Sequence, residues 1–338
     1  MSNPVGVPGP TGKRPAWATG RSVRYTPGGR TARFLNRSFP QSYAAVSLLP
    51  RLGSGYLWLR RLERAGAGRR LDRLSICAYR KSDTVFVFGT GASINDYPPE
   101  YWELVRDHDS IGMNFFLLHE HVPTFHVMEN VSNERKHLLR IRYAEHGDYK
   151  NTPLIIKTQL TNLSANRVRR RIGDIYDLPP EVRVNAYLSL DLLAAGDSVN
   201  DMVGAYRLTE KLGLWRPKPH FLLLTKRRGS VAYIVNFAVR AGYRRIVLCG
   251  VDLNHPEHFY EVRRHELESA GLPVPLNDET GPVHGTNDPS KHPVVIHDVL
   301  LAMKDSILDP AGIELLVGSE TSALYPDLSC FNWAEAIG

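Results

Sequence analysis

The chain has 338 residues, 43% of them hydrophobic, so it can bury the core of one domain with an appendage or of two small domains. No stretch approaches the run of about 18 to 20 apolar residues that a membrane span needs, and the N-terminus does not resemble a secretory signal. The three cysteines, Cys77, Cys249 and Cys330, are far apart and odd in number, which excludes a disulfide framework and leads us to expect a cytoplasmic protein.

The positive charge is confined to the first quarter of the chain. Residues 1–82 contain 16 Lys and Arg against 2 Asp and Glu, a net charge of +14, whereas residues 83–338 carry a net charge of −7. Residues 1–41 are rich in Pro, Gly, Arg and Ser and have little apolar periodicity, so we expect a disordered basic arm.

Residues 42–82 form a basic amphipathic segment. In residues 42–64, Leu, Tyr and Trp alternate with Arg, while Pro50, Gly53 and Gly55 predict that no long helix forms. Two interpretations stay open: a membrane-surface element whose arginines pair with anionic lipid, or a helical segment packed on the main domain. Nucleic-acid binding is not expected, because no recognised reading module accompanies the arm.

From residue 83 onward, strands alternate with helices. Strands are predicted over residues 84–89, 110–116, 124–129, 154–158, 220–225, 245–253 and 312–319, and helices over residues 99–106, 198–213, 230–241 and 293–306. This order predicts an α/β fold over residues 83–338, with a Rossmann-like, mostly parallel sheet flanked by helices. Ligands of such sheets bind beyond the carboxyl ends of the strands, where the strand order reverses.

Three predicted strand ends carry residues suited to a ligand. The first leads into the glycine turn 89–94, Gly-Thr-Gly-Ala-Ser-Ile, where backbone N–H groups could approach a phosphate closely, although the third glycine of the dinucleotide fingerprint is absent. The second brings Asn114, with Glu129 and Asn130 at the end of the next strand. The third is residues 250–254, Gly-Val-Asp-Leu-Asn, followed by His255, His258 and Tyr260.

Together these strand ends resemble the bacterial sialyltransferases of glycosyltransferase family 42. The family's Gly-Asn-Gly-Pro-Ser-Leu turn is similar to residues 89–94, and its Cys-Asn-Gln-Phe is similar to residues 113–116. Its Thr-Ser-Gly, Gly-Tyr-Lys-Glu-Ile and Gly-Ile-Asp-Phe-Tyr motifs are similar to residues 229–231, 242–246 and 250–254, and residues 230–260 align without a gap. The resemblance covers about residues 83–320.

The resemblance implies a GT-A-variant transferase that moves an acidic sugar, of the sialic acid or Kdo type, from a CMP donor to a glycan or glycolipid acceptor with inversion. It implies that Thr90, Asn114, Asn130 and Ser230 contact the nucleotide and its sugar. It also implies that Tyr260 binds the departing phosphate, while Asn254 replaces the family's second tyrosine. The unmatched residues 131–215 are expected to build much of the acceptor side. The expected site comprises Gly89, Thr90, Gly91, Ser93, Asn114, Glu129, Asn130, Gly229, Ser230, Gly250, Asp252, Asn254 and Tyr260.

The general base of the family is a histidine at the end of a flexible lid. Residues 263–291 are rich in Gly, Pro, Asn, Asp and His without periodicity, so we expect a lid at about residues 255–292. The resemblance implies His292 as the base, with His284 as the rival. Imidazole titrates near neutrality and can take the proton of an acceptor hydroxyl while CMP leaves.

Two patterns resemble metal sites but are not expected to bind one. Asp107-His108-Asp109 precedes a predicted strand instead of following one, which favours turn chemistry. His119-Glu120-His121 and His126 lack the i, i+4 spacing of a zinc-binding helix. Since CMP has a single phosphate, we expect neither a metal nor another cofactor.

Two other functions stay open at this point. One is a pterin diphosphokinase-like enzyme that uses ATP and magnesium, and the other is a non-catalytic protein that binds a nucleotide sugar. A homo-oligomer also stays open. A glycolipid acceptor would explain a basic, aromatic arm that holds the enzyme at the inner face of the membrane.

Overall fold

The structure, a computed structural model, describes residues 40–129, 147–158, 180–193, 198–277 and 281–337, with the backbone alone for residues 40–51 and 147–148. Nearly all of the expected disordered arm, and the expected site residue Asn130, lie outside the described residues. Much of the unmatched stretch 131–215, the expected acceptor side, also lies outside them.

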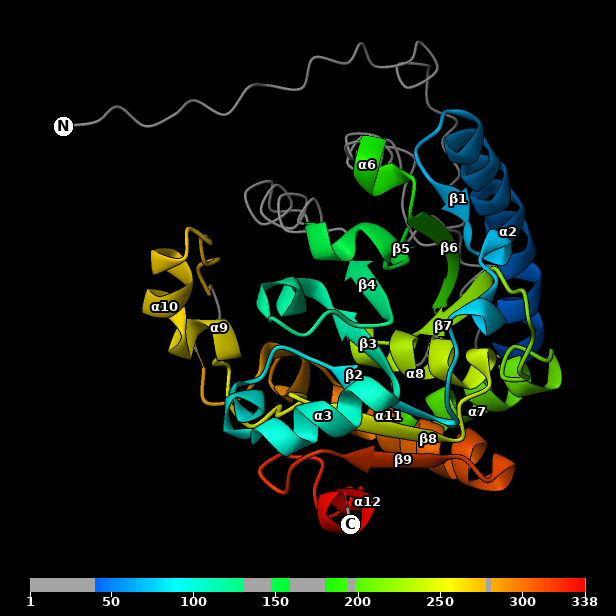
Figure 1. Cartoon of the computed structure of the whole chain (residues 1–338). Coiled ribbons are helices and arrows are strands. Elements are labelled where there is room, and N and C mark those ends of the chain that lie inside the picture. The colour runs from blue at the N-terminus through cyan, green and yellow to red at the C-terminus, as the bar shows by residue number, and fades with distance from the viewer. Residues whose placement is uncertain (1–39, 130–146, 159–179, 194–197, 278–280, 338) are drawn as a thin grey trace.

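Within the described residues, nine strands form one parallel sheet at the centre of the molecule (Figure 1). The order is β1-β6-β5-β4-β3-β2-β8-β9, and β7 pairs with β6 beside this path. The strands are β1 (Arg69–Arg70), β2 (Thr84–Phe88), β3 (Asp109–Met113), β4 (Phe125–Glu129), β5 (Leu154–Lys157), β6 (Ala186–Leu193), β7 (Leu223–Lys226), β8 (Arg245–Cys249) and β9 (Glu314–Val317). The predicted Rossmann-like α/β fold is confirmed.

Helices cover both faces of this sheet (Figure 1). Because successive strand residues point to opposite faces, Val85 and Val87 pack under α7, α8 and α11, while Phe86 and Phe88 pack under α3 and α12. The helices are α2 (Pro40–Arg64), α3 (Pro99–Asp107), α6 (Pro180–Arg183), α7 (Val199–Lys211), α8 (Ser230–Ala241), α9 (Phe259–Val262), α10 (Arg264–Ser269), α11 (Ile296–Met303) and α12 (Trp333–Ile337). Among the described residues, no helix combines the length and apolarity needed to cross a bilayer.

The strand order reverses at β2. From β2 the chain moves outward through β3, β4 and β5 to β6, and it later returns to place β8 on the other side of β2. We call the edge formed by the carboxyl ends of these parallel strands the rim. The junction of β2 and β8 on the rim is the point where ligands of open α/β sheets bind.

The expectation that Pro50, Gly53 and Gly55 interrupt the basic segment is wrong. Helix α2 runs without a break over Pro40–Arg64, and its residues Leu59 and Leu62 are fully buried against β5 and β6. Burial of one helix face stabilises the helix by more than two glycines cost it, which is why tertiary packing overrides propensity here.

The sheet domain also begins earlier than residue 83. Strand β1 pairs with β6, and Leu71, Leu74 and Ile76 belong to the main core. The sequence did not predict β6, the strand that connects β1, β5 and β7. Two predicted strands end early because the chain turns at positive φ, at Asn114 (φ 54°) and Gly250 (φ 61°).

The expected lid is more ordered than its composition indicates. It contains α9 and α10, and its side chains Phe259, Tyr260, Leu267 and Val274 are buried in the core shared with α3. Helix α9 packs on the short 3-10 helix η4 (Ala92–Asp96) that follows the glycine turn. A stretch without apolar periodicity therefore still contains two short helices, and its N-terminal part lies directly on the rim.

Candidate functional site

The glycine turn after β2 packs against the turn after β8. The N–H groups of Gly89 and Gly91 donate to the carbonyl groups of Cys249 and Gly250 at 2.7 and 2.8 Å. A Cβ atom at Gly89 would lie 2.2 Å from the carbonyl oxygen of Gly250, so only glycine fits.

The glycine turn therefore serves a different purpose from the one expected. Three of its amide groups, those of Gly89, Gly91 and Ser93, already donate hydrogen bonds within the protein. These three amide groups are therefore engaged within the protein, and the close approach that requires glycine is made by the neighbouring turn. The side chain of Thr90 is a further group that the turn can offer to a ligand.

Thr90 connects the turn to the lid. Its Oγ1 lies 3.0 Å from Nδ1 of His258, and its carbonyl group accepts the N–H of Phe259 at 2.8 Å. The ring of Tyr260 stacks on His258 at a centroid distance of 4.9 Å, and the ring of Phe115 meets Tyr260 edge-on at 5.9 Å. Thr90, His258 and Tyr260 thus form one cluster at the junction of β2 and β8.

Asn114 occupies the end of β3 in the left-handed conformation. Its carbonyl group lies 3.1 Å from Nε2 of His126, which holds the turn in place. Its side-chain oxygen is buried and has no hydrogen-bond partner among the described residues. A buried acceptor without a partner costs free energy unless a ligand or water satisfies it, which is consistent with a binding role.

Glu129 and Ser230, which were both expected in the site, contact each other. The hydroxyl group of Ser230 donates to Oε2 of Glu129 at 2.8 Å, and Nζ of Lys157 lies 3.0 Å from Oε1. Burial alone would raise the pKa of Glu129, but Lys157 and the hydrogen bond from Ser230 lower this pKa to about 2. Glu129 is therefore a carboxylate at every physiological pH.

A second buried ion pair lies on the rim near Ser230, Glu129 and Lys157. The sequence did not predict it. Asp191 is fully buried near the end of β6, and its Oδ2 lies 3.2 Å from Nζ of Lys226 at the end of β7. Burial lowers the pKa of Lys226 against the opposing effect of Asp191. The sequence pattern that could have indicated these buried ion pairs is a lysine at the end of an apolar strand, as in LIIK (154–157) and LLTK (223–226).

The two base candidates lie at different places on the rim. Nδ1 of His292 is 2.9 Å from the guanidinium group of Arg228, next to the start of α8. Burial and the charge of Arg228 lower the pKa of His292 below its usual value. His284 lies beside the Thr90 cluster, where its ring centroid is 6.3 Å from that of His258.

Three further expected residues have mainly structural contacts. The side chain of Asp252 accepts hydrogen bonds from Ser93, and that of Asn254 donates to the carbonyl group of Thr321 at 2.7 Å. Asn254 thus contacts the segment after β9. Gly229 precedes α8 without crowding, because a Cβ there would come no closer than 3.7 Å to another atom.

The residues of the two metal-like patterns bond to protein groups. Asp109 is fully buried, and its Oδ2 accepts the N–H groups of Lys81 and Ser82 at 2.8 and 3.1 Å. Nδ1 of His119 accepts the N–H of His121 at 3.0 Å. In the part of the chain that the structure describes, no three His, Cys, Asp or Glu side chains are grouped as metal ligands.

No protein-family model and no curated protein matches the sequence. Two solved structures are similar to it. The monofunctional alpha-2,3-sialyltransferase Cst-I from Campylobacter jejuni is 15% identical, with 74% of this chain and 81% of that chain covered and a TM-score of 0.43. The sialyltransferase CstII from Campylobacter jejuni, in complex with a substrate analogue, cytidine-5'-monophosphate, is 15% identical, with 74% of this chain and 85% of that chain covered and a TM-score of 0.40. Both likenesses are weak, so the roles considered below rest on the contacts of this chain.

Proposed function

We propose that the rim binds a CMP-activated acidic sugar, of the sialic acid or Kdo type, and transfers the sugar to a hydroxyl group of a glycan or glycolipid. The observation that carries this proposal is the cluster of Thr90, His258 and Tyr260 at the junction of β2 and β8. Polar and aromatic groups converge there at the reversal of strand order, where an open α/β sheet binds its ligand. The motif resemblance of residues 230–260 to family 42 adds support.

In this proposal Thr90, Asn114 and Ser230 contact the nucleotide and its sugar, and Tyr260 contacts the phosphate. The acceptor oxygen attacks the anomeric carbon of the sugar as the bond from that carbon to the phosphate oxygen breaks. CMP leaves with the electron pair, and a histidine takes the acceptor proton. His292 is the first candidate for this base, because its lowered pKa keeps the imidazole neutral at neutral pH. Its basic nitrogen, Nδ1, accepts from Arg228 in the structure, so Arg228 must move off Nδ1 before His292 takes the acceptor proton.

The hydrogen bond between Ser230 and Glu129 favours one nucleobase, cytosine, over uracil. Glu129 is ionised and can only accept, so the hydroxyl proton of Ser230 points to Glu129 and the oxygen of Ser230 presents lone pairs to a ligand. An amino group such as N4 of cytosine can donate to such an oxygen, whereas O4 of uracil cannot. This arrangement favours CMP over UMP.

The transfer proceeds without a metal in this proposal. The leaving group is a nucleoside monophosphate. Its developing negative charge would be stabilised by Tyr260 and by the basic side chains of Lys226 and Arg228 at the end of β7 instead of a divalent ion. Full activity in the presence of EDTA is the expected result. A loss of turnover that magnesium or manganese restores would contradict this part of the proposal.

The experiment that tests the proposal is a donor screen. CMP-sialic acid and CMP-Kdo are incubated with the full chain in EDTA, and release of CMP is followed without an acceptor, since transferases of this kind hydrolyse their donor slowly. ATP with magnesium serves as the comparison. CMP release from either sugar supports the proposal, whereas binding or turnover of ATP alone would replace it with the kinase-type function.

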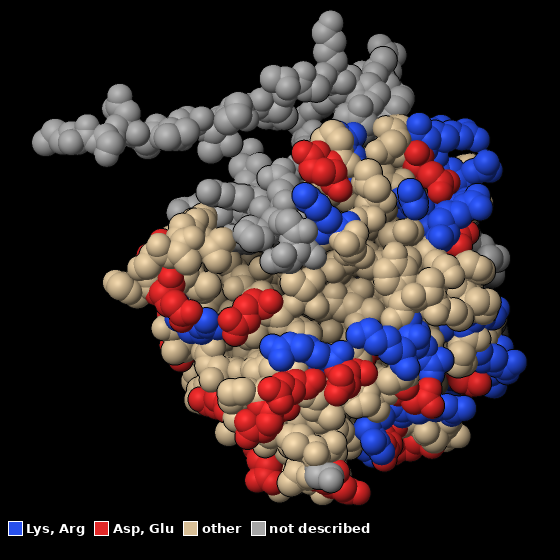
Figure 2. Space-filling view, viewed as in Figure 1, with Lys and Arg blue, Asp and Glu red and all other residues tan. Residues whose placement is uncertain are grey.

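We also propose that the outer face of α2 and β1 contacts an anionic membrane. Figure 2 shows Lys and Arg gathered over these two elements. Both nearby acids, Glu63 and Asp72, face the buried Arg70. Exposed arginines at positions 60, 61, 64, 69 and 73 make no ion pair with a described residue, and Leu57 among them is 61% exposed. Basic side chains with an exposed apolar one suit an anionic bilayer surface.

A further inference from the structure

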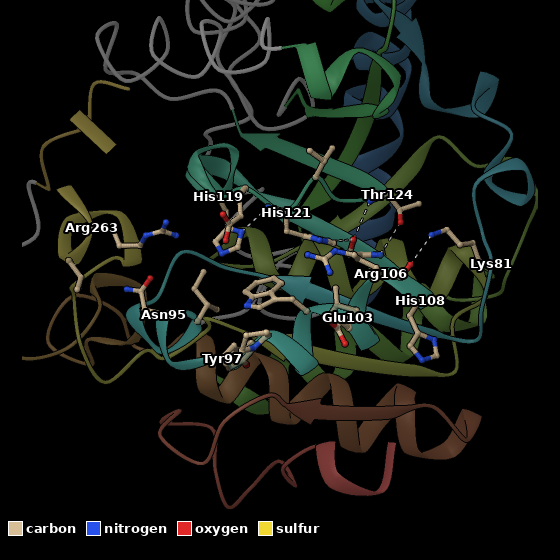
Figure 3. Close-up of a pocket in the computed structure, with 18 residues that line it drawn as sticks. Lys81, Asn95, Tyr97, Glu103, Arg106, His108, His119, His121, Thr124 and Arg263 are labelled. Carbon is tan, nitrogen blue, oxygen red and sulfur yellow. Dashed lines mark hydrogen bonds between the residues drawn. The ribbon is translucent and has the colours of Figure 1, made fainter. Parts of the chain in front are cut away.

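A groove of about 860 Å³ lies away from the rim cluster, on the face of the sheet that α3 covers (Figure 3). It runs between α3 and residues 119–124, from Asn95 and Arg263 at the lid to Lys81 and His108 at the opposite edge. None of the residues expected in the substrate site lines it. Its volume is in the range of about 300 to 1,000 Å³ that is usual for ligand sites.

The charges of this groove nearly balance. Lys81, Arg106 and Arg263 line it together with Glu103 and Glu120. Arg263 is already engaged, because its guanidinium group makes two hydrogen bonds to Glu266. A groove with both signs of charge does not favour nucleic acid or a polyanion, which bind where one sign dominates.

Two uncharged histidines lie between the charged ends. The ring of His119 lies 4.4 Å from that of Trp102 and 5.0 Å from that of Phe116, and burial lowers its pKa to about 3. Since Nδ1 of His119 accepts the N–H of His121, its proton is on Nε2, which can donate. Burial also lowers the pKa of His121 to about 4. The groove thus offers neutral donors and acceptors at physiological pH.

The lid end of the groove lies beside α9, whose residue Tyr260 belongs to the rim cluster. The ring of His119 lies 5.6 Å from that of Phe259, the residue between His258 and Tyr260. Nδ2 of Asn95 donates to the carbonyl group of Phe259 at 3.3 Å. Two residues that line the groove, His119 and Asn95, thus contact Phe259, the sequence neighbour of the tyrosine assigned to the phosphate.

We infer that this groove binds the neutral, polyhydroxylated chain of a glycan, whose end extends past α9 to the rim. Sugar hydroxyl groups donate and accept, so they match a lining that mixes neutral imidazoles, amides and both signs of charge better than an anion would. Because the inference makes the groove the acceptor site, it rests on the proposed transfer. It locates at least part of acceptor binding on the α3 face instead of in residues 131–215.

Binding is tested with the full chain on an array of immobilised neutral oligosaccharides of increasing length. Retained glycans are then titrated against Glu103→Gln/Arg106→Gln, two exposed side chains three residues apart on α3. The matched control is Arg207→Gln/Glu210→Gln, with the same spacing on α7 of the opposite face. We expect about tenfold weaker binding for the groove variant, as for the loss of one or two hydrogen bonds, and no change for the control.

The inference is overturned if no neutral glycan is retained or if the groove variant binds the retained glycans as tightly as the wild type. A second readout separates it from the proposed function. Donor hydrolysis without acceptor should be equal in the groove variant and the wild type, while KM for the glycan rises. If the wild type hydrolyses neither CMP donor, the proposed function fails; if it does and KM is unchanged in the variant, only the groove assignment fails.

Discussion

Asp252 accepts two hydrogen bonds from Ser93, one from its backbone N–H at 3.0 Å and one from its hydroxyl group at 2.5 Å. The two residues are 159 positions apart in the sequence, and both are buried. Their contact joins the turns that follow β2 and β8, at the point where the strand order reverses. The junction beneath the proposed donor site is therefore held by charge-assisted hydrogen bonds in addition to the sheet.

Replacing Gly89 with Ala should disrupt this junction. The new Cβ would lie 2.2 Å from the carbonyl oxygen of Gly250, a backbone atom that cannot turn away. We expect a loss of about 2 to 4 kcal/mol in the free energy of unfolding, as for severe overpacking of a core. Urea unfolding measures this loss.

Gly229→Ala is the matched control for that change. It adds the same atom at another glycine next to the site, where the nearest atom would be 3.7 Å away and φ is −88°. Because Gly229 is the N-cap of α8, where Ala is less favourable, the stability of this variant should fall by no more than about 1 kcal/mol. Equal destabilisation by both substitutions would show that close packing of the two turns is not what requires Gly89.

Replacing Glu129 with Gln should change the preference between CMP and UMP. Lys157 contacts Oε1 and Ser230 contacts Oε2, so a glutamine would turn its oxygen to Lys157 and its amide N–H₂ to Ser230. The hydroxyl proton of Ser230 would then point to the ligand, and its acceptor role would be lost. We expect the CMP-to-UMP affinity ratio to fall about tenfold, the equivalent of one hydrogen bond.

Calorimetric titration of both nucleotides measures this ratio. Ser230→Ala is the companion variant, since it removes the hydroxyl group and should weaken CMP while leaving UMP unaffected. A Glu129→Gln protein that still binds CMP with the wild-type ratio would contradict the assigned orientation of Ser230.

Much of the fold was readable from the sequence, because the strands at the centre of the sheet are short apolar runs. The predicted boundaries of α8 match the structure, and those of β2 and β4 differ by one residue. Strand β6 was missed because it carries Ser189 and Asp191 within its apolar run. Ser189 donates to Asp191, and Asp191 pairs with Lys226, which is distant in the sequence. Ion pairs between residues far apart in the chain leave no local pattern.

The site could be predicted only in part. A resemblance of motifs indicated Thr90, Ser230 and Tyr260. In the structure Thr90 follows β2, Ser230 begins α8 after β7, and Tyr260 lies in α9 next to Thr90's partner His258. The motif resemblance could not show that Gly89 and Gly91 pack against the turn after β8, because that contact depends on the register between β2 and β8. Nor could it show that Lys157 accompanies Glu129, because nothing in the sequence sets their pairing.

Replacing Arg228 with Asn should reveal which histidine is the base. Arg228 has a positive φ of 59°, which Asn adopts more readily than most residues, so the backbone should be kept. The change removes the cation that lowers the pKa of His292 and lets this pKa rise toward its usual value. The base must be neutral, so activity is lost as the pH falls through its pKa, and the acidic limb of kcat/KM should move to higher pH.

The pH profile of kcat/KM for donor and acceptor measures this limb. His292→Ala should reduce turnover at least 100-fold, in the range of general-base contributions. A limb that stays in place in Arg228→Asn, together with loss of turnover in His284→Ala, would assign the base to His284, beside His258.

Reversing charges on α2 and β1 should release the protein from anionic vesicles. Deletion of residues 1–64 is unsuitable as a test, because it would remove Leu59 and Leu62 from the core. The variant Arg60→Glu/Arg64→Glu/Arg69→Glu changes only exposed side chains. Each arginine near such a surface contributes about 1 kcal/mol, so binding should fall more than about 100-fold.

Co-sedimentation with phosphatidylcholine vesicles, with and without phosphatidylserine, measures this binding. The control reverses the charges of Arg207 and Lys211 on α7 and of Arg216 just after it, on the opposite face of the sheet. If both variants sediment as the wild type does, or if both are released equally, the contact is not made by α2 and β1.

The most direct test of the rim as a donor site is hydrogen exchange of the full chain with and without CMP, in EDTA. The account predicts that CMP slows exchange at the ends of β2, β3 and β8 and at the starts of α8 and α9, which surround Thr90, Asn114 and Ser230. It is contradicted if CMP leaves exchange unchanged at all of these places, or if protection is confined to segments away from the rim.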